Sequence, residues 1–213
     1  MSSTDSLPAE SSRADSLARR RQHLLAAAGE IFVRRGYHAA TMAEIADRAG
    51  FSKPVLYRQF SGKLELYLEV LQAHIDALIN GLRTALRSTT GNRRRVHAAV
   101  AAYFDFVDND TLGYRLIFES DAITEPSVQW RVGNAIDACV TAVSDLIAHD
   151  SGLESEDARA LAAGFVGASQ SSARYWLDSN RPIPKTSAVQ LAAELCWCGL
   201  SGGSAAPRPP GRS

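Results

Sequence analysis

The sequence has little cysteine and no long hydrophobic run. Its only cysteines, Cys139, Cys196 and Cys198, are too few for the disulfide framework of a small secreted protein. No apolar run reaches the length of a membrane-spanning helix, and the N-terminal stretch lacks the apolar core of a signal peptide. We therefore expect a cytoplasmic protein, associated with the nucleoid when bound to DNA, that does not engage a membrane.

Patterns for catalysis and metal binding are missing as well. The five histidines are scattered, and the chain contains no His-x-x-x-His pair, no nucleophile elbow and no phosphate-cradling glycine loop. Cys196 and Cys198 are two residues apart in an expected helix, so they point to nearly opposite sides and are badly placed to share a metal ion. We expect no enzymatic activity, no cofactor and no metal site.

No stretch alternates apolar and polar residues as a strand would, and apolar residues recur at helical spacing instead. The sequence thus predicts an all-α fold of about nine helices. Its net charge of zero is unevenly divided. Residues 1–63 hold 10 Lys and Arg against 6 Asp and Glu, whereas residues 64–213 hold 13 against 17. A basic N-terminal part joined to an acidic remainder is typical of a nucleic-acid reader that carries a second domain.

Residues 41–63 contain the signals of two short helices joined by a turn. Thr41 and Glu44 have the spacing of a capping box, which predicts a helix start. The apolar residues of this helix fall on one face, and Gly50 stands where a left-handed residue would end it. Ser52 is expected to cap a second helix, with Pro54 in its first turn.

The second helix is expected to bury Leu56 and Phe60, which lie four residues apart. Its outward face then carries Lys53, Pro54, Tyr57 and Arg58. An exposed tyrosine beside cations suits a helix end in the DNA major groove, where lysine and arginine reach guanine edges or phosphates. The alternative is a small helical hairpin with a charged outer face.

The segment GFSKPVLYRQFSGKLELY resembles the end of the DNA-binding domain of the TetR/AcrR family of bacterial transcriptional regulators. Thr41, Gly50, the Leu56-Tyr57-x-x-Phe60 pattern and Lys63 match, and the similarity runs from about Arg19 to about Leu71. The resemblance implies a three-helix helix-turn-helix domain in which Lys63 contacts a phosphate. We predict that the outward residues read DNA while Thr41, Ser52 and Lys63 anchor phosphates. The predicted DNA-binding set is Thr41, Ser52, Lys53, Pro54, Val55, Tyr57, Arg58 and Lys63.

The domain organisation is expected to follow from helix lengths. Residues 1–16 read as a disordered tail, 17–62 as the helix-turn-helix domain, 63–200 as a helical ligand-binding and dimerisation domain, and 201–213 as a flexible tail. A helix from Lys63 to about Ser88 would span roughly 39 Å, enough to join the two domains. The arginines at 19–21 open the first helix, where they could touch DNA or simply be solvated.

Aromatic residues crowd the middle of the chain. Such a cluster can form a solid core or the wall of an apolar ligand pocket. The family resemblance implies a small-molecule pocket inside the helical bundle and favours the second interpretation. The predicted pocket residues are Tyr103, Phe104, Val107, Tyr114, Phe118 and Trp130.

The last two helices are rich in small residues, which allow close helix approach. The resemblance implies a homodimer formed through these helices, with two recognition helices spaced for a palindromic operator. The predicted interface residues are Phe165, Ala168, Ser172, Trp176, Val189, Ala192 and Leu195.

These features predict a ligand-responsive regulator, a repressor that binds double-stranded operator DNA as a homodimer. A small apolar or amphipathic effector would displace the helix that begins at Lys63 and release the DNA. The alternative is a helix-turn-helix protein without an effector, which acts constitutively or under the control of a partner.

Overall fold

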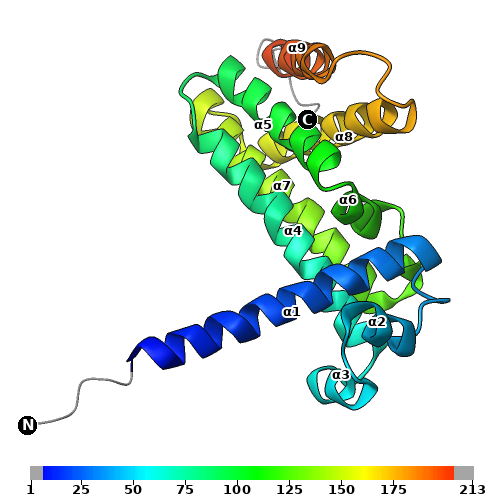
Figure 1. Cartoon of the computed structure of the whole chain (residues 1–213). Coiled ribbons are helices and arrows are strands. Elements are labelled where there is room, and N and C mark those ends of the chain that lie inside the picture. Colours follow the sequence, from blue (N-terminus) through cyan, green and yellow to red (C-terminus); the bar gives the residue numbers. More distant parts are fainter. Residues whose placement is uncertain (1–6, 204–213) are drawn as a thin grey trace, which may run out of the picture. The chain divides into compact units, whose positions relative to one another are not determined.

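The computed structural model describes residues 7–203, and every element in that range is helical (Figure 1). The predicted all-α fold is therefore confirmed. The elements are α1 (Leu7–Arg35), α2 (Met42–Ala49), α3 (Lys53–Gln59), α4 (Lys63–Arg87), α5 (Asn92–Asn109), α6 (Thr111–Phe118), the 3-10 helix η1 (Asp121–Thr124), α7 (Pro126–Ser151), α8 (Ser155–Asp178) and α9 (Lys185–Gly203).

The first helix begins at Leu7, ten residues before the start that the sequence suggests. This corrects the expected tail at residues 1–16, of which 1–6 lie outside the described residues. Pro8 is tolerated in a first turn, and Ala9, Glu10, Arg13 and Ala14 are good helix formers, so the helix can extend without an apolar stripe. Of the expected C-terminal tail, residues 201–203 continue α9 and the remainder lies outside the described part of the chain.

The chain divides into two compact units. The first combines the residues up to His74 with Arg115–Gln129, and the second combines Ile75–Tyr114 with the chain from Trp130 onward. The sequence led us to expect a domain boundary just before Lys63. In the structure, the first part of α4 and the segment around η1 belong to the same unit as the N-terminal helices. Helices α4, α6 and α7 each carry the chain from one unit to the other.

The core of the first unit is formed by the apolar faces of α1 to α4. Leu24, Ile45 and Leu56 are fully buried, and Phe60 is 1% exposed. The ring of Tyr67 packs edge-on against Phe32 at a centroid distance of 5.0 Å. Each fully buried side chain of this size contributes about 1.5 to 3 kcal/mol, so this core fixes the orientation of the short helices α2 and α3.

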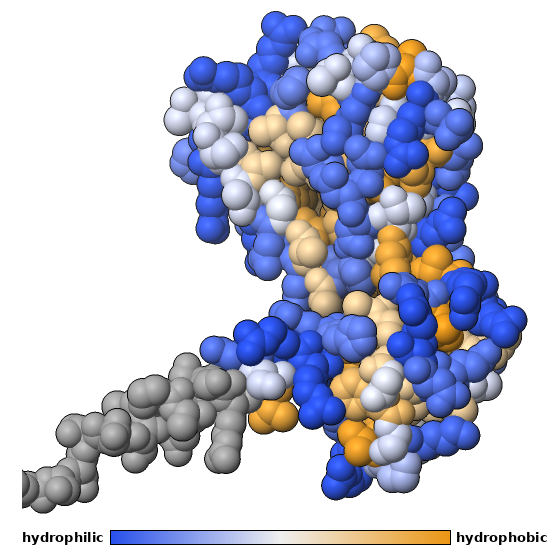
Figure 2. Space-filling model, in the orientation of Figure 1, coloured by the Kyte–Doolittle hydropathy of each residue, from blue (hydrophilic) through white to orange (hydrophobic). Residues whose placement is uncertain are grey.

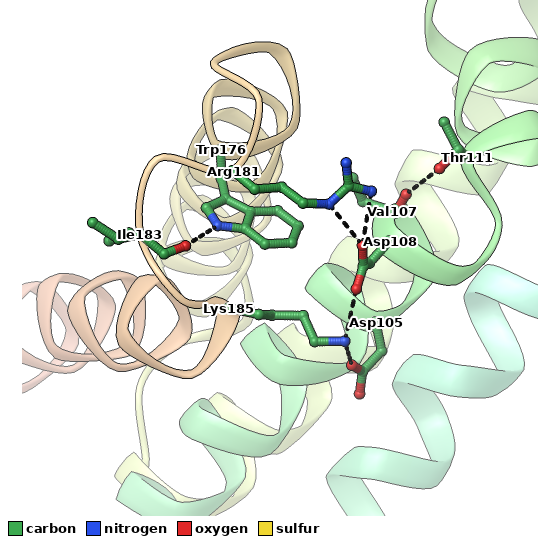
Figure 3. A network of polar contacts seen from close by, with 8 residues as sticks. All are labelled: Asp105, Val107, Asp108, Thr111, Trp176, Arg181, Ile183 and Lys185. Carbon is green, nitrogen blue, oxygen red and sulfur yellow. Dashed lines mark hydrogen bonds and ion pairs between the residues drawn. The ribbon is translucent and has the colours of Figure 1, made fainter.

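In the second unit, α5 packs against both α8 and α9, and the Phe104 and Trp176 rings lie 5.7 Å apart. A polar network ties the turn between α8 and α9 to α5 (Figure 3). Asp108 accepts hydrogen bonds from Arg181 at 2.9 and 3.0 Å and from Lys185 at 3.0 Å. Arg181 has a left-handed φ of 56°, and its guanidinium stacks on Trp176. These contacts hold the strained turn in one conformation.

No helix within residues 7–203 combines the length and the apolar character needed to cross a membrane. On the face seen in Figure 2, hydrophilic residues cover most of the surface and hydrophobic residues appear as smaller patches between them.

Candidate nucleic-acid interface and ligand-binding bundle

Contacts between residues close in the sequence set the positions of α2 and α3, as predicted. The Thr41 hydroxyl accepts from the Glu44 amide at 3.2 Å, and the Glu44 carboxylate accepts from the Thr41 amide at 3.1 Å, which completes the capping box. The hydrogen bonds from Thr41 also hold the pKa of Glu44 below its usual range. Gly50 adopts the left-handed conformation with φ 67°, and the Phe51 amide donates back to the Ala46 carbonyl at 2.9 Å. The two helices therefore meet at a defined angle.

Helix α3 presents the residues that the sequence assigns to DNA. Leu56 is fully buried, while Lys53, Pro54, Tyr57 and Arg58 are exposed, with Tyr57 at 55%. Val55 is half-buried. The outer face of α3 thus combines two cations with an aromatic ring, the composition expected of a major-groove reader.

The two hydroxyl residues assigned to phosphates differ in their surroundings. Thr41 is exposed, but its oxygen already serves the capping box. Ser52 occupies the N-cap position of α3, yet its side chain makes no capping hydrogen bond, which corrects the expected cap. The Ser52 carbonyl instead accepts from the Val55 and Leu56 amides at 3.0 and 3.1 Å. The exposed Ser52 hydroxyl is consequently not used in capping α3, and its assignment to a phosphate stays a prediction.

Lys63 has a structural role that the sequence does not reveal. Its ammonium donates to the carbonyls of His38 and Ala40 at 2.9 and 3.0 Å and lies 4.6 Å from the centroid of the Tyr37 ring. These contacts hold the connection between α1 and α2 against the start of α4. Its assignment to a phosphate stays a prediction.

Arginines from α1 lie beside the outer face of α3. A hollow of about 500 Å³ is bordered by Leu17, Arg20, Arg21, Val55, Arg58 and Gln59. Arg20 stacks on Phe51, and Arg21 stacks on Phe60 while its guanidinium pairs with Glu69. Among the described residues, no carboxylate forms an ion pair with Arg20 or Arg58. Arg20 therefore adds a further cation beside the DNA-facing side of α3. From the sequence, this arginine could either touch DNA or simply be solvated.

A segment from the middle of the chain completes the first unit. The Asp121 carboxylate of η1 accepts hydrogen bonds from the Tyr37 and His38 amides at 2.7 and 3.2 Å. Burial raises the pKa of Asp121, but these amides outweigh it and hold the pKa below its usual range. The Tyr67 hydroxyl donates to the Leu116 carbonyl at 3.0 Å, and burial raises the pKa of this phenol to about 12. No local pattern in the sequence indicates these contacts.

The structure brings together only part of the predicted pocket. Phe104, Val107 and Tyr114 are buried in the second unit, and burial raises the pKa of the neighbouring Tyr103, whose hydroxyl lies near Tyr114 and Cys139. Trp130 is 67% exposed, so its assignment to the pocket is corrected. The inward face of α7 carries Val128, Val132, Ala135 and Cys139, and a residue two positions after Val128 points away from it.

Phe118 is half-buried and belongs to the first unit, whereas the other predicted pocket residues belong to the second. The predicted pocket residues that lie inside the second unit are therefore Tyr103, Phe104, Val107 and Tyr114. Cys139 lies with them, although the sequence did not assign it to the pocket. Burial raises the pKa of the Cys139 thiol to about 11, so it stays neutral at physiological pH.

Most of the predicted dimer residues are used inside the chain. Phe165, Trp176, Val189 and Ala192 are at most 6% exposed, because α8 and α9 bury these faces against each other and against α5. Ala168 and Ser172 are half-buried, and only Leu195 is exposed, at 64%. Large apolar side chains that the described part of α8 and α9 exposes include Tyr175, Leu191 and Leu195.

Comparison with known proteins connects this arrangement with DNA-binding regulators. A family model described as bacterial regulatory proteins, tetR family, matches residues 24–70. Over 182 residues the chain is 60% identical to the HTH-type transcriptional activator FasR of Mycolicibacterium smegmatis, which covers 85% of this chain and 83% of that protein.

Solved structures show the same fold over nearly the whole length. A TetR-like transcriptional regulator from Rhodococcus sp. RHA1 superposes with a TM-score of 0.72 at 25% identity, over 86% of this chain and 96% of that one. The transcriptional regulator FadR from Bacillus subtilis, solved in complex with stearoyl-CoA, superposes with a TM-score of 0.68 at 15% identity, over 84% and 98%.

Proposed function

Since this chain belongs to the tetR family of bacterial regulatory proteins, we propose that it binds a palindromic operator as a homodimer and loses DNA affinity when an acyl-bearing effector enters its helical bundle. As a family member it is a ligand-responsive transcriptional regulator with a helix-turn-helix, not an enzyme. The observation that carries the proposal is the outer face of α3, where Lys53, Tyr57 and Arg58 are exposed beside Arg20. Such a regulator acts in the cytoplasm, where its operator lies.

An acyl effector is supported by two observations. The Bacillus subtilis regulator of the same fold was solved with stearoyl-CoA, an amphipathic acyl thioester. The second unit of this chain also has an interior of aromatic and aliphatic side chains with a few polar atoms, the Tyr103 and Tyr114 hydroxyls and the Cys139 thiol. An apolar wall with few polar groups is the usual lining of a small-molecule site.

The homodimer is supported by the exposed apolar residues of the last two helices. Tyr175 is 69% exposed, Leu191 60% and Leu195 64%, although large apolar side chains are more stable when covered. Pairing of these helices across a twofold axis would cover them. Two α3 helices would then reach successive major grooves about 34–36 Å apart.

Transmission of the ligand signal is supported by the chain path. The helices α4, α6 and α7 each contribute residues to both units, and the segment Arg115–Gln129 groups with the DNA-binding helices. A ligand that moves these helices within the second unit would therefore act on the first. An effector that prefers the non-binding form by a hundredfold supplies about 2.7 kcal/mol per site, enough to empty an operator.

The direction of regulation, repression or activation, is proposed from a relative. The sequence favours a repressor, whereas the relative of 60% identity is named as an activator. We therefore propose that the protein activates its target genes in the unliganded state.

Fluorescence anisotropy with DNA from the region upstream of its own gene tests this function. We expect specific binding that weakens at least tenfold on addition of stearoyl-CoA. Specific binding that no acyl compound alters would favour a constitutive or partner-regulated regulator. Absence of specific binding at low salt would contradict the DNA-binding role.

A further inference from the structure

An arginine-lined hollow opens in the second unit, where the end of α4 meets α5 and α7. Its volume is about 710 Å³, within the range of small-molecule sites. Its charged or titratable lining residues are Arg83 and Arg87 of α4, Arg95 of α5, and Asp145 and His149 of α7. The lining thus includes three arginines and one aspartate.

The three arginines are not equally neutralised. Arg95 pairs with Asp150 at 2.7 Å, and its Nε donates to the Thr89 carbonyl at 3.3 Å, so it is held in place. Within the described part of the chain, neither Arg83 nor Arg87 forms an ion pair with a carboxylate. Because they lie four residues apart on one helix, they repel each other by a few tenths of a kcal/mol. A bound anion would remove this repulsion.

Helix termination explains only one of these two residues. Arg87 is the last residue of α4, where a cation is stabilised by the negative end of the helix. Arg83 lies before the last turn, and the helix dipole acts mainly within that turn. The helix dipole therefore accounts for a cation at position 87 but not for one at position 83.

The hollow also has an apolar side next to the buried interior. Leu86 and Leu146 line it together with the arginines. Along α7, Cys139 lies one turn before the lining residue Ala142, and the charge of Arg83 opposes the effect of burial on the pKa of Cys139. The hollow is therefore close to the set that contains Cys139 and Tyr103. The hollow thus offers a site for phosphate groups beside an apolar interior.

We propose that this hollow binds the phosphate groups of an acyl thioester effector, with Arg83 and Arg87 as the phosphate-contacting residues. Arginine suits this role because its planar guanidinium donates two parallel hydrogen bonds to a phosphate. The charge of Arg95 is already compensated by Asp150, so the uncompensated positive charge of the hollow comes from Arg83 and Arg87. The inference rests on the proposed function, from which it takes the acyl thioester class.

Isothermal titration calorimetry on the full chain, with stearoyl-CoA and stearate as probes, tests this site. The double substitution R83Q/R87Q removes both cations, and R93Q/R94Q is the matched control, because Arg93 and Arg94 are exposed arginines of α5 outside the hollow. We expect R83Q/R87Q to weaken stearoyl-CoA binding at least tenfold and to reduce its salt dependence. Stearate binding should not change, and the control should match the wild type.

A second variant, R83K/R87K, keeps the charge but loses the bidentate geometry, and it should bind stearoyl-CoA with intermediate affinity. Wild-type affinity for stearoyl-CoA in R83Q/R87Q would overturn the site and leave the proposed function standing. Equal loss of stearate and stearoyl-CoA would also overturn it. If the wild type binds operator but no stearoyl-CoA, the proposed effector class fails and this site fails with it.

Discussion

Arg58 is the residue on which sequence-specific DNA reading is expected to depend. Its side chain is exposed on the outer face of α3 and has no carboxylate partner among the described residues. We expect Arg58→Ala to cost about 1 to 3 kcal/mol on the operator and to relax the preference at one base pair of each half-site. Anisotropy titrations on the operator and its single-base variants measure both effects.

Arg48→Ala is the control for this substitution, because Arg48 is also exposed but pairs with Glu30 at 2.6 Å. It should leave the base preference unchanged. An Arg58→Ala variant that weakens binding to every DNA sequence equally would limit Arg58 to a phosphate contact.

Two glycines with the same backbone conformation differ in their surroundings. Gly50 and Gly36 both have a left-handed φ, of 67° and 80°. A Cβ at Gly50 would meet nothing within 4 Å, whereas a Cβ at Gly36 would lie 2.9 Å from Oδ2 of Asp121. We expect Gly50→Ala to destabilise the protein by about 1 kcal/mol through backbone strain alone.

Gly36→Ala should cost about 1 kcal/mol more than Gly50→Ala, because it also disturbs a hydrogen bond to Asp121. Urea unfolding of the two variants measures the difference. Equal destabilisation of the two variants would mean that the Asp121 carboxylate can move away from the new methyl group without losing its stabilising hydrogen bonds.

At the scale of elements, η1 is attached to the turn after α1 through the Asp121 carboxylate. Hydrogen bonds from Tyr37 and His38 hold its pKa below the ordinary value of 3.8, so the ionised form is the one that stabilises the fold. This stabilisation is fully present above about pH 4 and is lost as the pH falls through the lowered pKa.

We therefore expect Asp121→Asn to reduce the free energy of unfolding at pH 7 and to have a smaller effect near pH 3. Urea titrations of both proteins at the two pH values test this. A destabilisation that does not change with pH would show that the shape of the side chain matters and its charge does not.

At the scale of the whole molecule, the exposed leucines of α9 are expected to hold two chains together. Introducing carboxylates with Leu191→Glu and Leu195→Glu should convert the dimer into a monomer, because burial of unpaired charges is costly. Operator affinity should fall by at least a hundredfold, since each half-site is then bound separately. Analytical ultracentrifugation and anisotropy measure the two effects.

The matched control is Trp130→Glu, which places a carboxylate at an exposed apolar residue outside α8 and α9. It should leave both the oligomeric state and operator affinity unchanged. A double variant at Leu191 and Leu195 that stays dimeric would remove α9 from the interface.

The sequence by itself determined the all-helical fold and the helix-turn-helix. The capping box at Thr41, the left-handed Gly50 and the burial of Leu56 and Phe60 all depend on residues within about twenty positions of one another. Local hydrogen bonding and helical periodicity act over this range, so the pattern in the sequence was sufficient to predict them.

Only the tertiary structure decided which face of each long helix is covered. On α8 the buried face includes Phe165 and Trp176, so two residues expected at a dimer interface pack inside the chain instead. The contact of Asp121 with Tyr37 joins residues 84 positions apart. Periodicity marks an apolar stripe but does not name its partner, and the arginine hollow forms only because the bundle brings α4, α5 and α7 together.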